Sequence, residues 1–186
     1  MSPLNTPGAV RKATSKGLVE IFTGDGKGKT TAALGVALRA SGHGLKVFIV
    51  YFMKGSFPYG ERKALSHLPN IKFARFGLKG FVDPNNVTET EKEEARKALQ
   101  KAKEVTLSNE YDIIILDEIN VATAWNLIDI DEVVKLIKEK PQKVELILTG
   151  RYADDKLVEL ADLVTDMTKI KHPYDKGILA RKGIDY

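Results

Sequence analysis

Short apolar runs recur along the chain, and polar residues, glycine or proline end most of them. Two runs, at 47–52 and 113–116, are almost wholly apolar, which is typical of strands buried on both faces of a parallel sheet. The other strands that this pattern predicts lie at 18–22, 71–76, 144–148 and 163–167. Helical segments separate most of these strands, and this alternation favours parallel βαβ units with helices on both faces of the sheet.

The clearest helical pattern follows residue 88. Thr88 and Glu91 form a capping box at its start, which satisfies backbone groups that the first turn leaves open. Apolar residues then recur at helical spacing while the other faces are charged; they are Ala95, Ala98, Leu99, Ala102 and Val105. Further helices are predicted at 29–41, near 61–67, at 131–140 and from residue 152 to about residue 161.

The segment between the first strand and the first helix reads TGDGKGKTT over residues 23–31. Backbone N–H groups in such a loop point inward and bind phosphate oxygens, helped by the positive end of the following helix. Lys29 is expected to reach the phosphates, and the Thr30 hydroxyl to ligate Mg²⁺. The sequence predicts a site for ATP with Mg²⁺ formed by Thr23, Gly24, Asp25, Gly26, Lys27, Gly28, Lys29, Thr30 and Thr31.

This loop departs from the strict pattern G-x-x-x-x-G-K-[ST], because Thr23 stands at the first glycine position. The alternative is a structural turn with a chance lysine and threonine, which the flanking strand and helix disfavour. A dinucleotide-binding fold would need an acid at the end of the second strand, where residues 51–54 read Tyr-Phe-Met-Lys. The predicted fold is therefore α/β and P-loop NTPase-like (RecA-like), a mostly parallel sheet in a three-layer αβα arrangement.

Asp117 and Glu118 directly follow the buried strand 113–116, the position of a Walker B carboxylate. We expect this strand to lie beside the first strand, so that a carboxylate faces the metal held by Thr30. A simple helix cap is the alternative. Arg151 follows the strand 144–148 and is expected at the same edge, where open α/β sheets bind ligands. The alternative, that Arg151 is an ordinary surface residue, stays open.

Composition limits the class of protein. The 186 residues suit one domain, with a flexible basic arm at 1–16, which carries Arg11 and Lys12, and a single P-loop domain at 17–186. The chain has no cysteine, which excludes disulfides and thiolate metal sites. The three histidines lack the spacing of a zinc site.

No apolar run approaches the ~20 residues that span a bilayer, and the start of the chain lacks the apolar core of a signal peptide. We therefore expect a cytoplasmic protein with no membrane partner. The net charge is +4, with acids and bases interleaved, whereas a nucleic-acid binder would gather its basic residues into a stripe. No nucleic-acid partner is expected.

Half of the aromatic residues, seven of 14, lie between Tyr51 and Phe81. Several of them stand among glycines and prolines rather than in a regular strand or helix. Two interpretations stay open: a loop folded onto the core, or an apolar surface for a large, flat second ligand.

Six separated stretches resemble ATP:corrinoid adenosyltransferases of the P-loop type, enzymes of cobalamin biosynthesis. They are TGDGKGKTTAALGVALRA, VYFMKG, YDIIILDEIN, LILTGR, ADLVTDM and IKHPYDKGI…ARKGIDY. The resemblance implies transfer of the 5′-deoxyadenosyl group of ATP to the Co(I) of a corrinoid, cobalamin or cobyrinic acid diamide, with release of triphosphate. Because Co(I) is itself the nucleophile, this transferase needs no Ser, Cys or His nucleophile.

The resemblance also implies roles for single residues. Lys29, Phe81 and Glu118 would be catalytic, and Thr30 and Glu118 with Asp117 would hold Mg²⁺, or Mn²⁺ in its place. Further implications are a homodimer and a flavoprotein as the source of the reducing electron.

One segment departs from the family. The family's loop commonly reads Gly-Glu-Gly-Phe-Thr-Trp, and residues 78–83 read LKGFVD, so Phe81 matches whereas Asp83 replaces the tryptophan. In the family those two aromatic residues displace the lower axial ligand of cobalt.

Two other functions fit the phosphate loop. A P-loop ATPase or kinase would cleave at the γ-phosphate, with Glu118 orienting water or an acceptor hydroxyl. A nucleotide-gated protein that binds a corrinoid without chemistry would leave ATP intact.

Overall fold

The computed structural model describes residues 16–186, so the predicted arm at 1–16 lies, apart from Lys16, outside the described residues. One six-stranded sheet has the strand order β3-β2-β4-β5-β1-β6, and every neighbouring pair is parallel. Its strands are β1 (Val19–Thr23), β2 (Val47–Tyr51), β3 (Ile71–Arg75), β4 (Ile113–Asp117), β5 (Glu145–Thr149) and β6 (Leu163–Asp166). All six strands match the apolar runs to within about two residues, the usual uncertainty of element ends.

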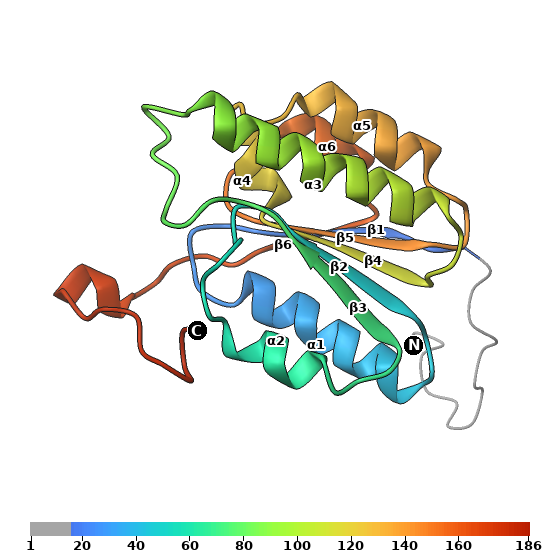
Figure 1. Ribbon diagram of the computed structural model, residues 1–186, viewed down its shortest axis with the longest axis horizontal. Coiled ribbons are helices and arrows are strands. Elements are labelled where there is room, and N and C mark those ends of the chain that lie inside the picture. Colours follow the sequence, from blue (N-terminus) through green and yellow to red (C-terminus); the bar gives the residue numbers. More distant parts are fainter. Residues whose placement is uncertain (1–15) are drawn as a thin grey trace, which may run out of the picture.

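Helices cover both faces of this sheet, as Figure 1 shows. One face carries α1 (Lys29–Gly42) and α2 (Gly60–Leu65). The other carries α3 (Glu89–Leu107), α4 (Ile119–Ala124), α5 (Ile130–Glu139) and α6 (Asp155–Leu160). The predicted three-layer αβα arrangement is confirmed. Within residues 16–186, none of the helices is long and apolar enough to cross a membrane.

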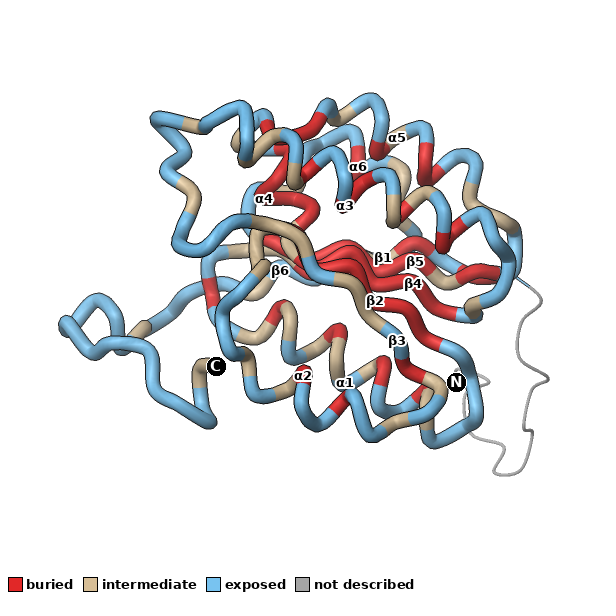
Figure 2. The backbone as a smooth tube through the Cα atoms, viewed as in Figure 1, coloured by how far each residue is buried: buried red, intermediate tan, exposed pale blue. Residues whose placement is uncertain are grey.

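The strand β2 shows how the core is built. All five of its residues are buried, and alternate side chains enter different clusters, because successive strand residues point to opposite faces. Ile49 belongs to the cluster beneath α1, whereas Phe48 and Val50 belong to the cluster beneath α3. Figure 2 shows the central strands buried, whereas the edge strand β6 and the outer faces of the helices are exposed.

The helix α3 forms as predicted. The Glu91 N–H donates to Thr88 Oγ1 at 3.3 Å, and the Thr88 N–H donates to Glu91 Oε2 at 2.8 Å, which completes the capping box. The five apolar positions predicted to face the core are all buried.

Three features differ from the sequence predictions. The strand that ends at Asp117 does not lie beside β1, because β5 separates β4 from β1. An apolar run gives no information on sheet neighbours when the strand is buried on both faces. The short helix α4 and the 3₁₀ turn η1 (Pro173–Lys176) were also missed, since about one and a half turns are too short to show helical periodicity.

A pair of acids lies toward the end of the sheet where β1 and β5 begin. Glu20 is on β1 and Glu145 on the neighbouring β5. Burial, together with the hydrogen bond and the charge of Glu145, raises the pKa of Glu20 to about 7. Because this pKa lies above the ordinary value of 4.5, the protonated form stabilises the fold, and that stability is lost as the pH rises through about 7.

We expect Glu20→Gln to raise the melting temperature at pH 8 by about 2–4 °C, as about 1 kcal/mol does in a domain of this size. The amide keeps a donor for Glu145 and carries no charge. At pH 5, where Glu20 is already protonated, the variant should melt within about 1 °C of the wild type. Thermal melts at both pH values check this, with Glu159→Gln on the exposed side of α6 as the control. An equal shift at both pH values would exclude the charge of Glu20 as the cause.

Candidate active site

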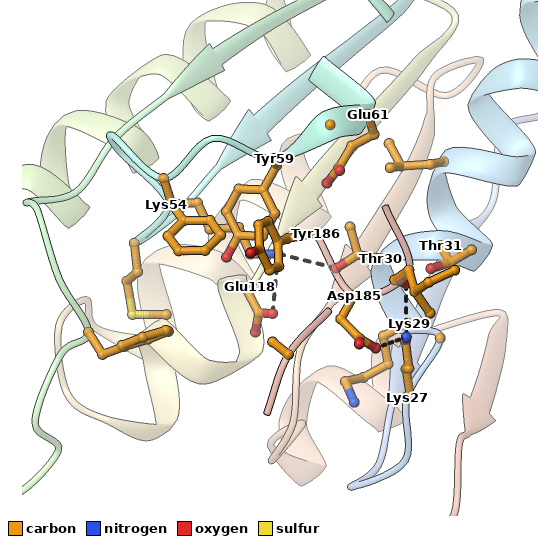
Figure 3. A pocket seen from close by; sticks show the side chains of 18 of the residues that line it. Lys27, Lys29, Thr30, Thr31, Lys54, Tyr59, Glu61, Glu118, Asp185 and Tyr186 are labelled. Atoms are coloured by element: carbon orange, nitrogen blue, oxygen red, sulfur yellow. Dashed lines mark hydrogen bonds and ion pairs between the residues drawn. The ribbon is translucent and has the colours of Figure 1, made fainter. Parts of the chain in front are cut away.

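A cavity of about 1360 Å³ opens at the carboxyl edge of the sheet, where open α/β folds bind their ligands. Its walls are the glycine loop with the first turns of α1, residues 53–61 after β2, residues 78–82, Glu118 with α4, and the C-terminal segment. Figure 3 shows the polar end of this cavity. The structure therefore gathers segments from the whole length of the chain.

The glycine loop rests on the chain that follows β6. Gly24 has a φ of +93°, a conformation that glycine adopts most easily, and a Cβ there would stand 2.7 Å from the Met167 carbonyl oxygen. A Cβ at Gly26 would also collide with this carbonyl. The Gly26 N–H donates to Met167 O at 2.6 Å. This N–H therefore anchors the loop to the segment that follows β6. The predicted phosphate-binding site consequently depends on the other N–H groups of the loop.

Lys29 begins α1 and its side chain folds over the loop. Its Nζ donates to the carbonyl oxygens of Gly24 at 2.7 Å and Gly26 at 2.6 Å. Burial lowers the pKa of Lys29, and the charge of Arg151 lowers it further, against the opposing Glu118. The ammonium lies at the position where an incoming phosphate can replace the two carbonyl oxygens.

Asp117 lies at the centre of the hydrogen-bond network. It is 1% exposed, and its Oδ1 accepts from the Thr30 hydroxyl at 2.8 Å and from the Thr149 hydroxyl at 2.7 Å. The Glu118 N–H donates to Thr149 Oγ1 at 3.0 Å. Thr149 thus bridges the acid pair from β5, the strand that separates β4 from β1.

Glu118 has a left-handed backbone, with φ 66° and ψ 19°, where α4 begins. This conformation is costly for a residue with a Cβ and is concentrated at functional sites. Burial raises the pKa of Glu118 despite the nearby Lys54 ammonium, and the Asp117 carboxylate raises it further. The side chain lines the cavity.

Lys54 was not predicted as a site residue, yet it contacts every predicted metal ligand. Its Nζ lies 2.6 Å from Asp117 Oδ2. It also lies 3.2 Å from Thr30 Oγ1 and 3.4 Å from Glu118 Oε1 (Figure 3). Burial alone would lower the pKa of Lys54, but the carboxylates of Asp117 and Glu118 outweigh it, so the pKa lies above its ordinary value. The available signal was its place just after β2, at the carboxyl edge of the sheet.

The other residues predicted to bind ATP, from the glycine loop and after β5, differ in their placement. Asp25, Lys27, Thr31 and Arg151 line the cavity. Thr23 ends β1 behind the wall, where its hydroxyl accepts from the Ala153 N–H at 3.3 Å.

The last residues of the chain close over the glycine loop. Lys27 Nζ donates to Ile184 O at 2.9 Å and pairs with the Asp185 carboxylate (Figure 3). The ring of Tyr186 packs against Phe57 at 5.1 Å between centroids. Sequence reasoning used this tail only for the family resemblance, because contacts across more than 150 residues leave no local pattern.

The aromatic residues divide between the two interpretations left open. Tyr51 and Phe52 are fully buried core residues, whereas Phe57 and Phe81 line the cavity with 39% and 92% exposure. Trp125, in contrast, is both partly buried against the core and part of the cavity wall. The cavity wall thus combines the polar glycine loop with several aromatic side chains.

Asp83 does not serve as a substitute for the aromatic residue that the family resemblance leads one to expect there. Its Oδ1 accepts from the Asn85 N–H at 2.9 Å, which closes a turn, and its side chain is outside the cavity wall.

Comparison with known proteins shows which family the chain belongs to. The family model described as ATP:corrinoid adenosyltransferase BtuR/CobO/CobP matches residues 15–186. The chain belongs to this family. The corrinoid adenosyltransferase of Escherichia coli (strain K12) is 39% identical over 171 residues, which cover 92% of this chain and 86% of that protein. The resemblance that the six stretches carry is therefore confirmed over nearly the whole chain.

Two further relatives give the same result. The corrinoid adenosyltransferase of Sinorhizobium sp is 40% identical over 178 residues, covering 94% of this chain and 83% of that protein. Corrinoid adenosyltransferase CobA of Salmonella typhimurium is 35% identical over 171 residues, covering 92% of this chain and 86% of that protein.

We expect Lys29→Ala and Thr30→Ala each to lower kcat/KM for ATP by at least about tenfold, because each removes a contact to a charged ligand. Both melting temperatures should stay within about 3 °C of the wild type, since neither side chain fills the core. Steady-state kinetics and thermal melts check this, with Lys72→Ala on exposed β3 as the control. Near wild-type kcat/KM in either variant would contradict the assignment of the loop.

Proposed function

We propose that the protein is an ATP:corrinoid adenosyltransferase, which transfers the 5′-deoxyadenosyl group of ATP to the Co(I) of a corrinoid. The observation that carries this proposal is one cavity whose wall joins the glycine loop, Glu118 of the acid pair and aromatic side chains. Its volume of about 1360 Å³ exceeds the ~300–1,000 Å³ of common ligand pockets, as two large substrates require. Membership of the adenosyltransferase family supports the same reaction.

The bond changes balance without a protein nucleophile. Co(I) supplies the electron pair for the new Co–C bond at C5′. The C5′–O bond breaks, and inorganic triphosphate leaves with the electron pair of that broken bond. Lys29 and the open N–H groups of the loop bind the triphosphate and stabilise the negative charge that grows on it. They also orient C5′ toward the second substrate.

The residues of the acid pair fit Mg²⁺, or Mn²⁺. Oxygens of Thr30, Asp117 and Glu118 surround one cation position, where the Lys54 ammonium lies 2.6 to 3.4 Å from them. Hydroxyl and carboxylate oxygens are the ligands that these hard ions prefer. A bound divalent ion would neutralise charge on the leaving triphosphate. Thr149 keeps the Asp117 carboxylate in the orientation that faces Thr30.

The aromatic side chains of the cavity wall suit the corrinoid ring, which is large, flat and mostly apolar at its faces. They include Phe57, Phe81 and Trp125, together with Tyr59 beside Lys54. Phe81 is 92% exposed and so has most of its surface left for a second ligand. Since Asp83 lies outside the wall, Phe81 is the residue of the family's aromatic pair that can take the place of the lower axial ligand.

Two further features of the proposal come from the family resemblance, namely a homodimer and a flavoprotein that supplies the electron for cobalt. A cytoplasmic location is proposed from the sequence alone. Residues 17–186 are proposed to act as a single domain.

Inorganic triphosphate is the expected phosphorus product when protein, ATP, Mg²⁺ and chemically reduced cobalamin react to completion. Attack at C5′ leaves all three phosphates joined, so phosphorus NMR should show triphosphate in step with a light-sensitive Co–C bond. The Lys29→Ala variant serves as the control and should form neither. Stoichiometric ADP would contradict the transferase and favour an ATPase or kinase, whereas intact ATP would favour a corrinoid-binding protein without chemistry.

Phe81→Ala should slow the reaction at least about tenfold when Co(II) and a mild reductant are supplied. An axial donor raises the energy of the cobalt orbital that must accept the electron. An apolar side chain in place of that donor lowers this orbital energy, so Co(II) is easier to reduce. With pre-reduced Co(I) the loss should be less than about threefold. Phe81→Leu, which keeps an apolar side chain, is the matched control and should retain most of the Co(II) reaction.

Both assays use one preparation of each variant, with the KM for ATP and the melting temperature measured beside them. If Phe81 only anchors its loop, both assays should fall together, along with ATP affinity and thermal stability. Equal losses in the two assays would therefore contradict a part for Phe81 in cobalt reduction.

A further inference from the structure

The ammonium of Lys54 lies where the proposed metal ligands converge. Its side chain is 12% exposed, while those of Asp117 and Glu118 are 1% and 24% exposed. Three oxygens from three different elements lie within 3.4 Å of this one nitrogen. In the described structure, the Lys54 ammonium therefore compensates the negative charge of Asp117 and Glu118. In the proposed function a divalent ion compensates the same charge.

The backbone of Lys54 is held on both sides. Its N–H donates to Phe76 O at 2.9 Å, and its carbonyl oxygen accepts from the guanidinium of Arg62. Arg62 is 7% exposed and lies 4.9 Å from the ring centroids of both Tyr51 and Tyr59. A buried guanidinium between two rings orders the segment after β2. Lys54 is thus positioned by packed neighbours, and Arg62 is a positioning residue.

Electrostatics require a cation at this place. Two adjacent carboxylates with little exposure repel each other and have lost most of their hydration, which is costly unless a positive charge compensates. Lys54 supplies that charge in the described structure. A divalent ion at the same oxygens would meet the ammonium at contact distance, so the two cations exclude each other.

The ammonium has one open direction, since Lys54 lines the cavity beside the glycine loop. Its Nζ is also 5.3 Å from the ring centroid of Tyr59, a face that attracts cations. A polyphosphate on the glycine loop would bring new negative charge to this side. The anion gives Lys54 a partner other than Asp117 and so frees the carboxylate oxygens.

We propose that Lys54 is a built-in counter-ion that closes the acid pair to free divalent cations until a nucleotide arrives, and then turns onto the nucleotide's polyphosphate. This rests on the proposed metal ligands Thr30, Asp117 and Glu118. The protein accordingly takes up metal together with nucleotide, and free metal does not occupy the site in advance.

The test measures Mn²⁺ binding to the nucleotide-free protein by electron paramagnetic resonance. Lys54→Met keeps the length of the side chain and removes its charge, so it should bind Mn²⁺ at least about tenfold more tightly than the wild type. Lys54→Arg, which keeps the charge, and Lys63→Met, on the exposed side of α2, should bind like the wild type. Equal Mn²⁺ affinity in Lys54→Met and the wild type would overturn the proposal.

Thermal melts keep the test decisive if the variant is unstable, because Lys54→Met leaves two carboxylates without their cation. Mn²⁺ should raise the melting temperature of this variant and leave that of the wild type nearly unchanged. Adding Asp117→Asn to the same variant should abolish the rise. A rise of the same size in the wild type would contradict the proposal.

The metal assignment itself is tested separately with ATP present. Wild-type protein with ATP should bind Mn²⁺ in a ternary complex, and Thr30→Ala should weaken that complex. An unchanged complex in Thr30→Ala would contradict the metal ligands. In contrast, a weakened complex together with wild-type behaviour of nucleotide-free Lys54→Met would contradict only the role of Lys54.

Kinetics give a readout that a purely structural role would not move. If Lys54 binds the polyphosphate, Lys54→Met should raise the KM for ATP about tenfold and lower kcat by a smaller factor, as loss of uniform binding does. Lys54→Arg should restore most of the ATP affinity. If Mn²⁺ raised the melting temperature of Lys54→Met but the KM of this variant for ATP were unchanged, the second half of the proposal, in which Lys54 turns onto the polyphosphate, would be contradicted.

Discussion

The buried carboxylate of Asp117 must be compensated, and much of the site follows from that requirement. Leaving one partner of such a buried pair uncompensated costs about 3–5 kcal/mol, a large part of the stability of an ordinary domain. The compensation comes from Thr30 on α1, Thr149 on β5 and Lys54 after β2. A single side chain at the end of β4 thereby links a helix, a strand and a loop that are distant in sequence.

The same network explains why the strand order does not separate the acid from the glycine loop. β5 lies between β4 and β1, yet α1 brings Thr30 to within 2.8 Å of Asp117 Oδ1. Thr149 supplies the bridging hydroxyl from the intervening strand. Side chains at the carboxyl edge thus connect β4 to the helix that follows β1, although β4 and β1 are not neighbours in the sheet.

Local patterns were enough to predict the layers of the fold, the capping box of α3, the glycine loop and the acid pair. Each of these depends on residues within one element or at its end. The order of strands, the role of Lys54 and the closure by Asp185 depend on contacts between distant segments, which leave no spacing to read. Lys54 illustrates the difference, since its place after an apolar strand was visible whereas its partners were not.

The pairing of Lys27 with Asp185 has a consequence for folding. Domains tend to fold N-terminal parts first during synthesis, but Ile184 and Asp185, which contact Lys27, lie more than 150 residues further along the chain. The glycine loop therefore acquires this wall long after the loop itself has been made. A nascent chain that has not yet reached residue 184 has an incomplete cavity, so completion of the cavity depends on a segment that is synthesised late relative to the loop.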